Sequence, residues 1–265
     1  MSMAEKHNPL SRFGFSCKRG GTHTSRTMML AELRALLTYV DRPEAEKSDY
    51  LQAIDHENCL GKRSGKTRTL TYRHLVDLYA LDTTCVLFRA LLYFWKRDSD
   101  GQPLLALLCT LARDSIFRAT APFILKIPEG ATVTREALEA CLDSQAPGRF
   151  SKATLKSTAQ NINSTWTQSG HLYGRARKVR SRAKPTAGSV AYALLLGYLE
   201  GHRGQALLQT EYTRGLDCTF DTAIELAETA SRKGWIVFKR VGDVIEVVFP
   251  ALLNPDEMEW LREQS

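Results

Sequence analysis

Apolar side chains at helical spacing dominate the first half of this chain and restrict its fold more than any other feature. Met28, Leu33 and Leu37 belong to one such stripe, and residues 70–126 continue the pattern through three or more helices. Almost no strand signal occurs before Ile127. We therefore expect a mainly α fold with an all-helical N-terminal half.

After Ile127 the pattern changes to helix, turn, helix, short strand and basic loop. This is the order of a winged helix-turn-helix. Thr132 is the expected N-cap of a short helix, and Ser151 is the expected N-cap of a longer helix that ends at Gly170. A module of this kind is therefore predicted at residues 128–185.

A similar order of elements follows in residues 186–265. Thr219 is a candidate N-cap, a β-hairpin is expected to turn at Gly242-Asp243, and an amphipathic helix is expected at Pro255–Glu263. The predicted fold is therefore mainly α, with an N-terminal helical region followed by one or two winged helix-turn-helix modules with short β-hairpins. The expected segments are a flexible basic arm at 1–24, an all-helical region at 25–127, and the two modules at 128–185 and 186–265.

Charge is distributed unevenly along the chain. Residues 144–199 contain no Asp or Glu, although the overall composition of 29 acids in 265 residues predicts about six in such a window. A surface that excludes acids while collecting bases favours a polyanion, because carboxylates repel phosphates. The bases in this window are Arg149, Lys152, Lys156, Arg175, Arg177, Lys178, Arg180, Arg182 and Lys184.

The helix expected at residues 151–169 is the leading candidate for DNA recognition. Its core-facing stripe contains Leu155, Ala159, Ile162 and Trp166. Lys, Asn, Gln and Thr side chains suit a major groove, where they reach phosphates and base edges. An ordinary solvated amphipathic helix is the alternative interpretation. The predicted polar ridge consists of Lys152, Lys156, Gln160, Asn163 and Thr167.

The basic segment after Tyr173 is interpreted as a wing that follows the DNA backbone, with a flexible linker as the alternative. A second basic loop, GKRSGKT, lacks the spacing of a nucleotide-binding P-loop and is a candidate for secondary phosphate contacts. The candidate DNA-binding residues here are His171, Arg175, Arg177, Lys178, Arg180, Arg182 and Lys184, and the candidate secondary contacts are Lys62, Arg63, Lys66 and Arg68.

Catalytic and metal motifs are weak in this sequence. Neither GxSxG nor HExxH occurs, so no catalytic residue, metal or cofactor is expected. A zinc site from Cys17, His23, His56 and Cys59 matches no common finger spacing. Apolar stretches are too short to span a membrane, and scattered cysteines without a signal peptide favour a cytoplasmic location.

Several short pieces of sequence resemble the BrxA-like accessory proteins of BREX phage-exclusion systems of bacteria. They are Asn58-x-Leu60-x-Lys62-x-Ser64, the segment Arg149–Asn161, and Trp166–Gly170 followed by His171-Leu172. The resemblance implies a mainly helical, non-enzymatic protein that binds double-stranded DNA beside other defence proteins. It places DNA contacts on Lys152, Lys156 and Asn163 and on the loop after Tyr173.

Two other functions remain open from the sequence. The first is an assembly adaptor that docks a protein partner through Met258, Trp260 and Leu261 of the last helix, although these side chains would serve internal packing equally well. The second is RNA binding, which ranks below duplex DNA because stacking aromatics are sparse in the basic window. Double-stranded DNA is therefore the expected partner, with other proteins of the defence system as further candidates.

Overall fold

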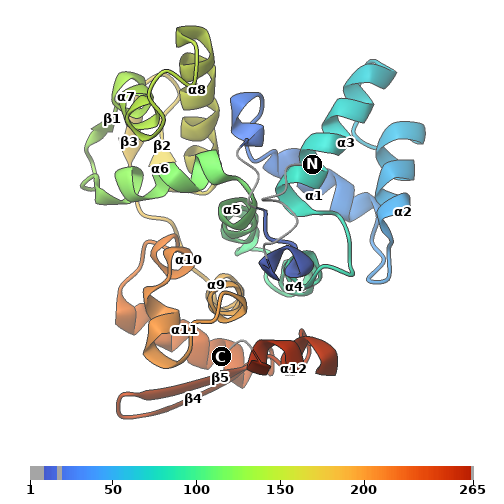
Figure 1. Cartoon of the computed structure of the whole chain (residues 1–265), viewed down its shortest axis with the longest axis vertical. Coiled ribbons are helices and arrows are strands. Elements are labelled where there is room, and N and C mark those ends of the chain that lie inside the picture. The colour runs from blue at the N-terminus through green and yellow to red at the C-terminus, as the bar shows by residue number, and fades with distance from the viewer. Residues whose placement is uncertain (1–8, 17–19, 264–265) are drawn as a thin grey trace.

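The computed structural model describes residues 9–16 and 20–263, which form a mainly α-helical protein. The first half contains helices alone among the described residues, as the apolar periodicity predicts (Figure 1). Its elements are the short helices η2 (Pro9–Phe13), η3 (Thr22–Thr24) and η4 (Gln52–His56), and the helices α1 (Leu30–Tyr39), α2 (Lys47–Leu51), α3 (Gly65–Tyr79), α4 (Val86–Arg97) and α5 (Gln102–Arg113).

Two helices without a polar face form the centre of the molecule. Residues 104–112 of α5 are all buried, and α9 (Ala187–Leu199) is buried at nearly every position because its sequence is apolar on all sides. The two helices pack against each other and α4 packs against both. Asp98 at the end of α4 accepts a 2.7 Å hydrogen bond from the amide of Gly188, which fixes the start of α9.

A helical unit with a small sheet follows α5. Strand β3 lies in the middle of this sheet, which has the order β1-β3-β2 with antiparallel pairing throughout. The first helix, α6, packs against α7, and α7 packs against α8. The elements are α6 (Ser115–Lys126), β1 (Thr132–Val133), α7 (Arg135–Gln145), α8 (Lys152–Gln168), β2 (Leu172–Tyr173) and β3 (Lys178–Arg180).

The C-terminal part repeats the order of helices followed by a hairpin. The predicted hairpin is confirmed, with Val241 paired to Val244 on either side of the Gly242-Asp243 turn. Thr219 caps α11 and the last helix has the predicted bounds. After α9 come η5 (Gly204–Gln209), α10 (Glu211–Arg214), α11 (Phe220–Arg232), β4 (Val237–Val241), β5 (Val244–Val248) and α12 (Pro255–Glu263).

The prediction of a flexible arm at residues 1–24 is wrong for the residues that the structure describes. Phe13 and Phe15 are buried, and Phe13 packs edge-on against Trp260 of α12 with ring centroids 5.2 Å apart. His23 is also fully buried. The aromatic side chains explain the difference, because their burial outweighs the flexibility that Gly and Ser confer. Residues 1–8 and 17–19 lie outside the described part of the chain.

Two local predictions also differ from the structure. Thr132 belongs to β1, and the N-cap of α7 is Thr134, whose hydroxyl accepts from the amide of Ala137 at 3.2 Å. The basic segment GKRSGKT is not a loop throughout, because Ser64 caps α3 and the helix begins at Gly65. Within the described residues, no helix is long and apolar enough to cross a membrane.

Candidate nucleic-acid interface

Helix α8 begins and ends where its sequence predicts. The Ser151 hydroxyl accepts from the amide of Thr154 at 3.2 Å, and Gly170 leaves the helix with a φ of 86°. Ala159, Ile162 and Trp166 are fully buried. The Trp166 ring packs against Phe117 of α6 at 5.0 Å. The core-facing stripe therefore fixes the rotation of α8 about its axis, and with it the direction of the polar residues beside the stripe.

A polar ridge without acids lies beside this stripe on α8. Lys152, Lys156 and Gln160 are exposed, and Thr167 is half-buried. The exposed Ala153 between them is small enough to allow a close approach to this face. Long bases beside small residues suit contact with a groove of DNA, because the helix backbone lies close to the base edges there.

Asn163 does not belong to this ridge, so the prediction that it contacts DNA is wrong for the folded chain. The residue is 5% exposed and its side-chain Oδ1 has no hydrogen-bond partner among the described residues. It lies toward the apolar stripe, because a position four residues after Ala159 and three before Trp166 is within about 60° of both around the helix axis.

The basic segment after Tyr173 forms a hairpin rather than a linker. Tyr173 of β2 pairs with Val179 of β3, and Val179 pairs on its other side with Thr132 of β1. Gly174 has a φ of 93°, which favours glycine at the start of the turn. Side chains support the turn too, since Arg177 donates to the Thr132 hydroxyl at 2.7 Å.

The tip of this hairpin carries the bases that reach solvent. Arg175 and Arg177 are exposed, whereas Lys178 is half-buried and donates to the carbonyl of Gly174 at 2.7 Å. Burial lowers the pKa of Lys178. The turn at residues 174–177 is therefore the part of the segment available to a ligand, and its bases project from a defined backbone.

His171 lies inside the protein, so its predicted role in DNA contact is wrong. It is fully buried, and its Nε2 donates to the carbonyl of Gly215 at 3.1 Å. Its Nδ1 lies 2.8 Å from the Ser169 hydroxyl. Burial, together with the neighbouring Arg180, lowers the pKa of His171 to about 3. The neutral imidazole therefore connects the unit of α6, α7, α8 and the small sheet to the C-terminal part.

Arg180 is also an interior residue, and its predicted DNA contact is wrong for the same reason. Its side chain is 3% exposed and forms a 2.8 Å ion pair with Asp217, just before α11. It also donates to the carbonyls of Ile124 and His171, both at 3.2 Å. Arg180 therefore connects α6, β3 and the C-terminal part, and its charge is neutralised.

Arg182 and Lys184 follow β3 in the connection to α9 and are both exposed. Arg182 lies 3.4 Å from a carboxylate oxygen of Glu129. Arg180 and Arg182 thus have acidic partners from outside the acid-free window. The other seven of its nine bases have no acid within 4.0 Å among the described residues. Most of the excess positive charge in the window therefore remains unpaired.

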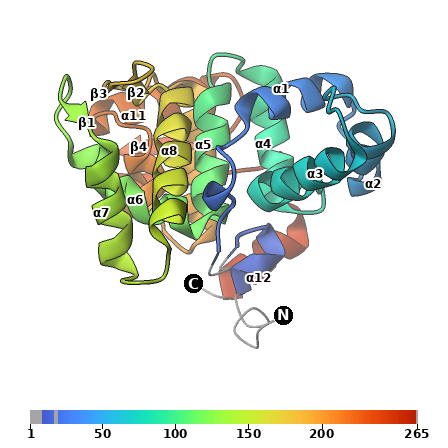
Figure 2. The same cartoon turned by 90° about the horizontal axis from the view of Figure 1, so that it is seen from above.

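The predicted secondary contacts lie apart from the hairpin. In Figures 1 and 2 α3 and the β1-β3-β2 sheet are on opposite sides of the molecule, with the N-terminal segment running between α8 and α3. Arg63 and Lys66 are exposed and Arg68 is half-buried. Lys62 forms a 3.1 Å ion pair with Glu32. The structure therefore does not bring these four bases into one surface with the hairpin tip.

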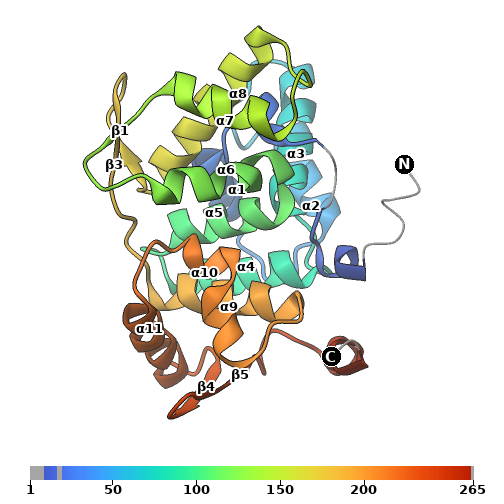
Figure 3. The same cartoon turned by 60° about the vertical axis from the view of Figure 1, so that its left-hand side comes forward.

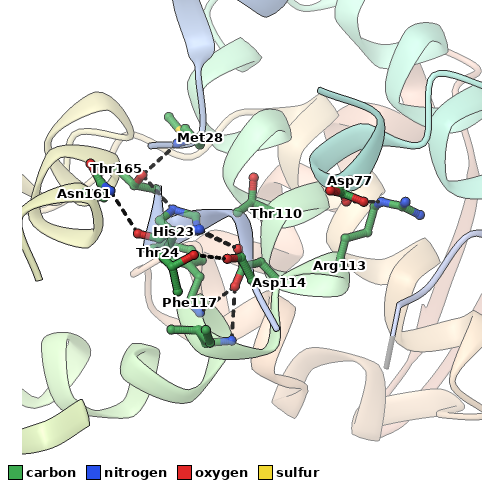
Figure 4. Close-up of polar contacts among 12 residues, drawn as sticks. His23, Thr24, Met28, Asp77, Thr110, Arg113, Asp114, Phe117, Asn161 and Thr165 are labelled. Atoms are coloured by element: carbon green, nitrogen blue, oxygen red, sulfur yellow. Dashed lines mark hydrogen bonds and ion pairs between the residues drawn. The ribbon is translucent and has the colours of Figure 1, made fainter. Parts of the chain in front are cut away.

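A buried polar network, which the sequence did not indicate, holds the N-terminal segment against α8 (Figure 4). The His23 Nδ1 lies 2.8 Å from a carboxylate oxygen of Asp114, and its Nε2 lies 2.9 Å from the Thr165 hydroxyl. Thr165 also accepts from the amide of Met28, and Asn161 donates to the carbonyl of His23. The segment therefore covers the flank of α8 beside the polar ridge and leaves the ridge open.

Asp114 is the anchor of this network. Its other carboxylate oxygen accepts from the first amides of α6, those of Ile116 at 3.1 Å and Phe117 at 3.0 Å. Burial by itself raises the pKa of Asp114, but His23 and these amides outweigh it and lower the pKa overall. The His23 ring also stacks on Phe117 at 4.6 Å. Full burial of His23 and Thr165 makes this a structural arrangement, because no substrate reaches it.

Helix α11 of the C-terminal part exposes acids, whereas α8 exposes bases. Asp221, Glu225 and Glu228 are exposed along α11. In α12, Leu261 is 2% exposed and Trp260 packs on Phe13, so the apolar face proposed for an adaptor serves internal packing.

No cluster of three or more metal-ligating side chains occurs in residues 9–16 and 20–263. His23 of the weak zinc motif is occupied by Asp114, and Cys17 lies outside the described residues. The sequence matches no protein-family model and no curated protein.

Proposed function

We propose that residues 115–180 form a winged helix-turn-helix that binds double-stranded DNA. The order α6, β1, α7, α8, β2, β3 supports this, because it is the order of helices and strands in a winged helix. The sheet order β1-β3-β2 places the wing strands beside the strand that precedes the second helix. Helix α8 lies in or over the major groove, and the turn at residues 174–177 follows the backbone.

The observation that carries the proposal is that α8 and the hairpin tip both expose bases and contain no acids of their own. Lys152 and Lys156 extend from the ridge, and Arg175 and Arg177 extend from the turn. Each base without an acidic partner can neutralise one phosphate and release its counterion. The acidic outer face of α11 makes the C-terminal part a poor second site, since its carboxylates repel phosphates.

We further propose a non-enzymatic, accessory role beside other proteins of a bacterial phage-exclusion system. Only the sequence pieces that resemble BrxA-like proteins support this assignment, and the expected DNA binding agrees with it. Protein partners would have to use a surface other than α12, whose apolar residues pack internally.

Salt-dependent binding to a labelled duplex tests the DNA proposal. A variant with Lys152, Lys156, Arg175 and Arg177 changed to Ala removes four phosphate contacts, so the slope of log K against log salt should fall by about 3.6. A matched variant removes the same charge from the C-terminal part, through Arg232, Lys233, Lys239 and Arg240. It should keep the wild-type slope. Equal losses in both variants, or no binding by the wild type at low salt, would refute the proposal.

Competition with single-stranded RNA separates the two nucleic acids. Stacking platforms for unpaired bases are few here, because Trp166 is fully buried and Phe150 lies under Arg149 at 4.9 Å. Tyr173 is the exposed large aromatic near the hairpin tip, at 56% exposure. Duplex DNA should therefore displace the labelled duplex at lower concentration than RNA of equal length. The reverse order would favour RNA binding.

A further inference from the structure

A cavity of about 440 Å³ lies where the unit of α8 meets the C-terminal part. Its walls come from α6, from the connection after β3, from α10 and from the start of α11. Figure 3 turns this side of the molecule toward the viewer, with α10 next to α6. The volume falls within the range of about 300–1,000 Å³ that is typical of small-molecule sites.

One wall of the cavity is apolar. Ala121, Pro122 and Leu125 of α6 line it, and they lie on one side of that helix because three and four residues complete about one turn. Pro122 is exposed and Leu125 is half-buried, so both present carbon surface to the space. Such a wall suits a flat, apolar body such as an aromatic ring.

Cationic side chains also line the cavity, one at the end of α6 and two on the other segments. Lys126, Arg182 and Arg214 come from three different elements. The cavity's two carboxylates are already paired, because Asp217 lies 2.8 Å from Arg180 and Glu211 lies 3.7 Å from Arg118.

Of the three cations that the described residues place at the cavity, Lys126 and Arg214 have no local counter-charge, whereas Arg182 has one. Arg182 lies 3.4 Å from Glu129. Lys126 and Arg214, in contrast, have no acid within 4.0 Å among the described residues. A phosphate monoester carries a charge of about −1.5 to −2 at neutral pH, so it matches this pair better than a single carboxylate does.

We propose that this cavity binds a small organic phosphate with a planar apolar body, the size of a mononucleotide. The phosphate pairs with Lys126 and Arg214, and the planar body packs against Pro122 and Leu125. The site is separate from the polar ridge of α8 and the hairpin tip, and the proposal does not depend on DNA binding. A ligand in the cavity contacts both the unit that contains α8 and the C-terminal part, which the ion pair of Arg180 and Asp217 connects.

Calorimetric titration of the full chain with AMP, GMP, CMP, UMP and inorganic phosphate tests this site. At least one nucleotide should bind ten times more tightly than inorganic phosphate, because only a nucleotide uses the apolar wall. R214E should weaken that nucleotide tenfold or more. The matched control, R240E, reverses an exposed arginine on β4 and should leave the affinity unchanged. K126E is a second cavity variant with an exposed side chain, in case R214E unfolds.

Three outcomes would overturn the proposal. The first is that no nucleotide binds more tightly than inorganic phosphate. The second is that R240E weakens binding as much as R214E and K126E do. The third comes from repeating the titration with the protein saturated by duplex DNA. Loss of nucleotide binding there would assign Lys126 and Arg214 to the DNA surface, whereas retained binding supports a separate site.

Discussion

His171 should make the protein less stable as the pH falls from 7 to 5. The side chain is fully buried and donates to the carbonyl of Gly215, and its pKa is about 3 in the folded chain. In the unfolded chain the pKa returns to about 6.5. Below pH 6.5 the unfolded chain therefore binds a proton at His171, whereas the folded chain does not until the pH approaches 3. The stability is intact above that pH and declines as the pH falls toward 3.

The size of this decline follows from the two pKa values. Linkage between proton binding and unfolding gives a loss of about 2 kcal/mol from His171 between pH 7 and pH 5. At pH 5 the folded imidazole, whose pKa is about 3, is largely neutral, so its own titration contributes little to this loss. The unfolded pKa therefore determines the magnitude.

Urea unfolding at pH 7 and at pH 5 measures the effect. Wild type and H171Q are compared by the change in unfolding free energy of each protein between the two pH values. Wild type should lose about 2 kcal/mol more than H171Q, because glutamine does not titrate. H74Q is the matched control, since His74 is only half-buried and its pKa is lowered to a lesser extent by burial and by Arg26. If wild type and H171Q lose the same unfolding free energy, the conclusion that His171 is held neutral in the folded chain is refuted.

Two further substitutions test the hairpin tip and the buried network. Gly174→Ala should weaken duplex binding and cost about 1–3 kcal/mol of stability, because φ is 93° and a Cβ would collide with the Arg177 carbonyl. Gly130→Ala, which also has a positive φ but open space around its Cβ, should keep the duplex affinity. His23→Ala should lower the urea unfolding free energy by about 3–5 kcal/mol at pH 7, because it leaves Asp114 buried without its partner. A loss below about 1 kcal/mol would show that the network does not hold the N-terminal segment.

Elements that local signals specify could be predicted from the sequence. Helix α8 combines an apolar stripe with a capping serine and a terminal glycine, and each of these signals acts on backbone only a few residues away from it. The C-terminal hairpin likewise follows from alternating β-branched residues around Gly242-Asp243. These signals lie within the element and do not depend on distant residues, so the predicted bounds agree with the structure.

Interior polar residues could not be predicted, because their partners are distant in the sequence. His171 bonds to Gly215, 44 residues away, and His23 bonds to Asp114, 91 residues away. Nothing in the neighbouring sequence distinguishes a buried base from an exposed one. Arg180 and Arg175 therefore received the same prediction, although only Arg175 is exposed. The burial of Phe13 and Phe15 had a local signal in their aromatic side chains, but the surrounding Gly, Ser and Arg suggested flexibility instead.

The two helix-and-hairpin units show that element order alone does not select a nucleic-acid surface. Both units place a capped helix before a hairpin, α8 before β2 and β3 and α11 before β4 and β5. Their exposed faces differ in charge, since α8 presents Lys152 and Lys156 and α11 presents Asp221 and Glu225. The same order of elements is therefore compatible with the proposed phosphate contact on α8 and unfavourable for it on α11. Within the first unit the burial of Arg180 removes it from the proposed contact surface, which consists of the ridge of α8 and the hairpin tip.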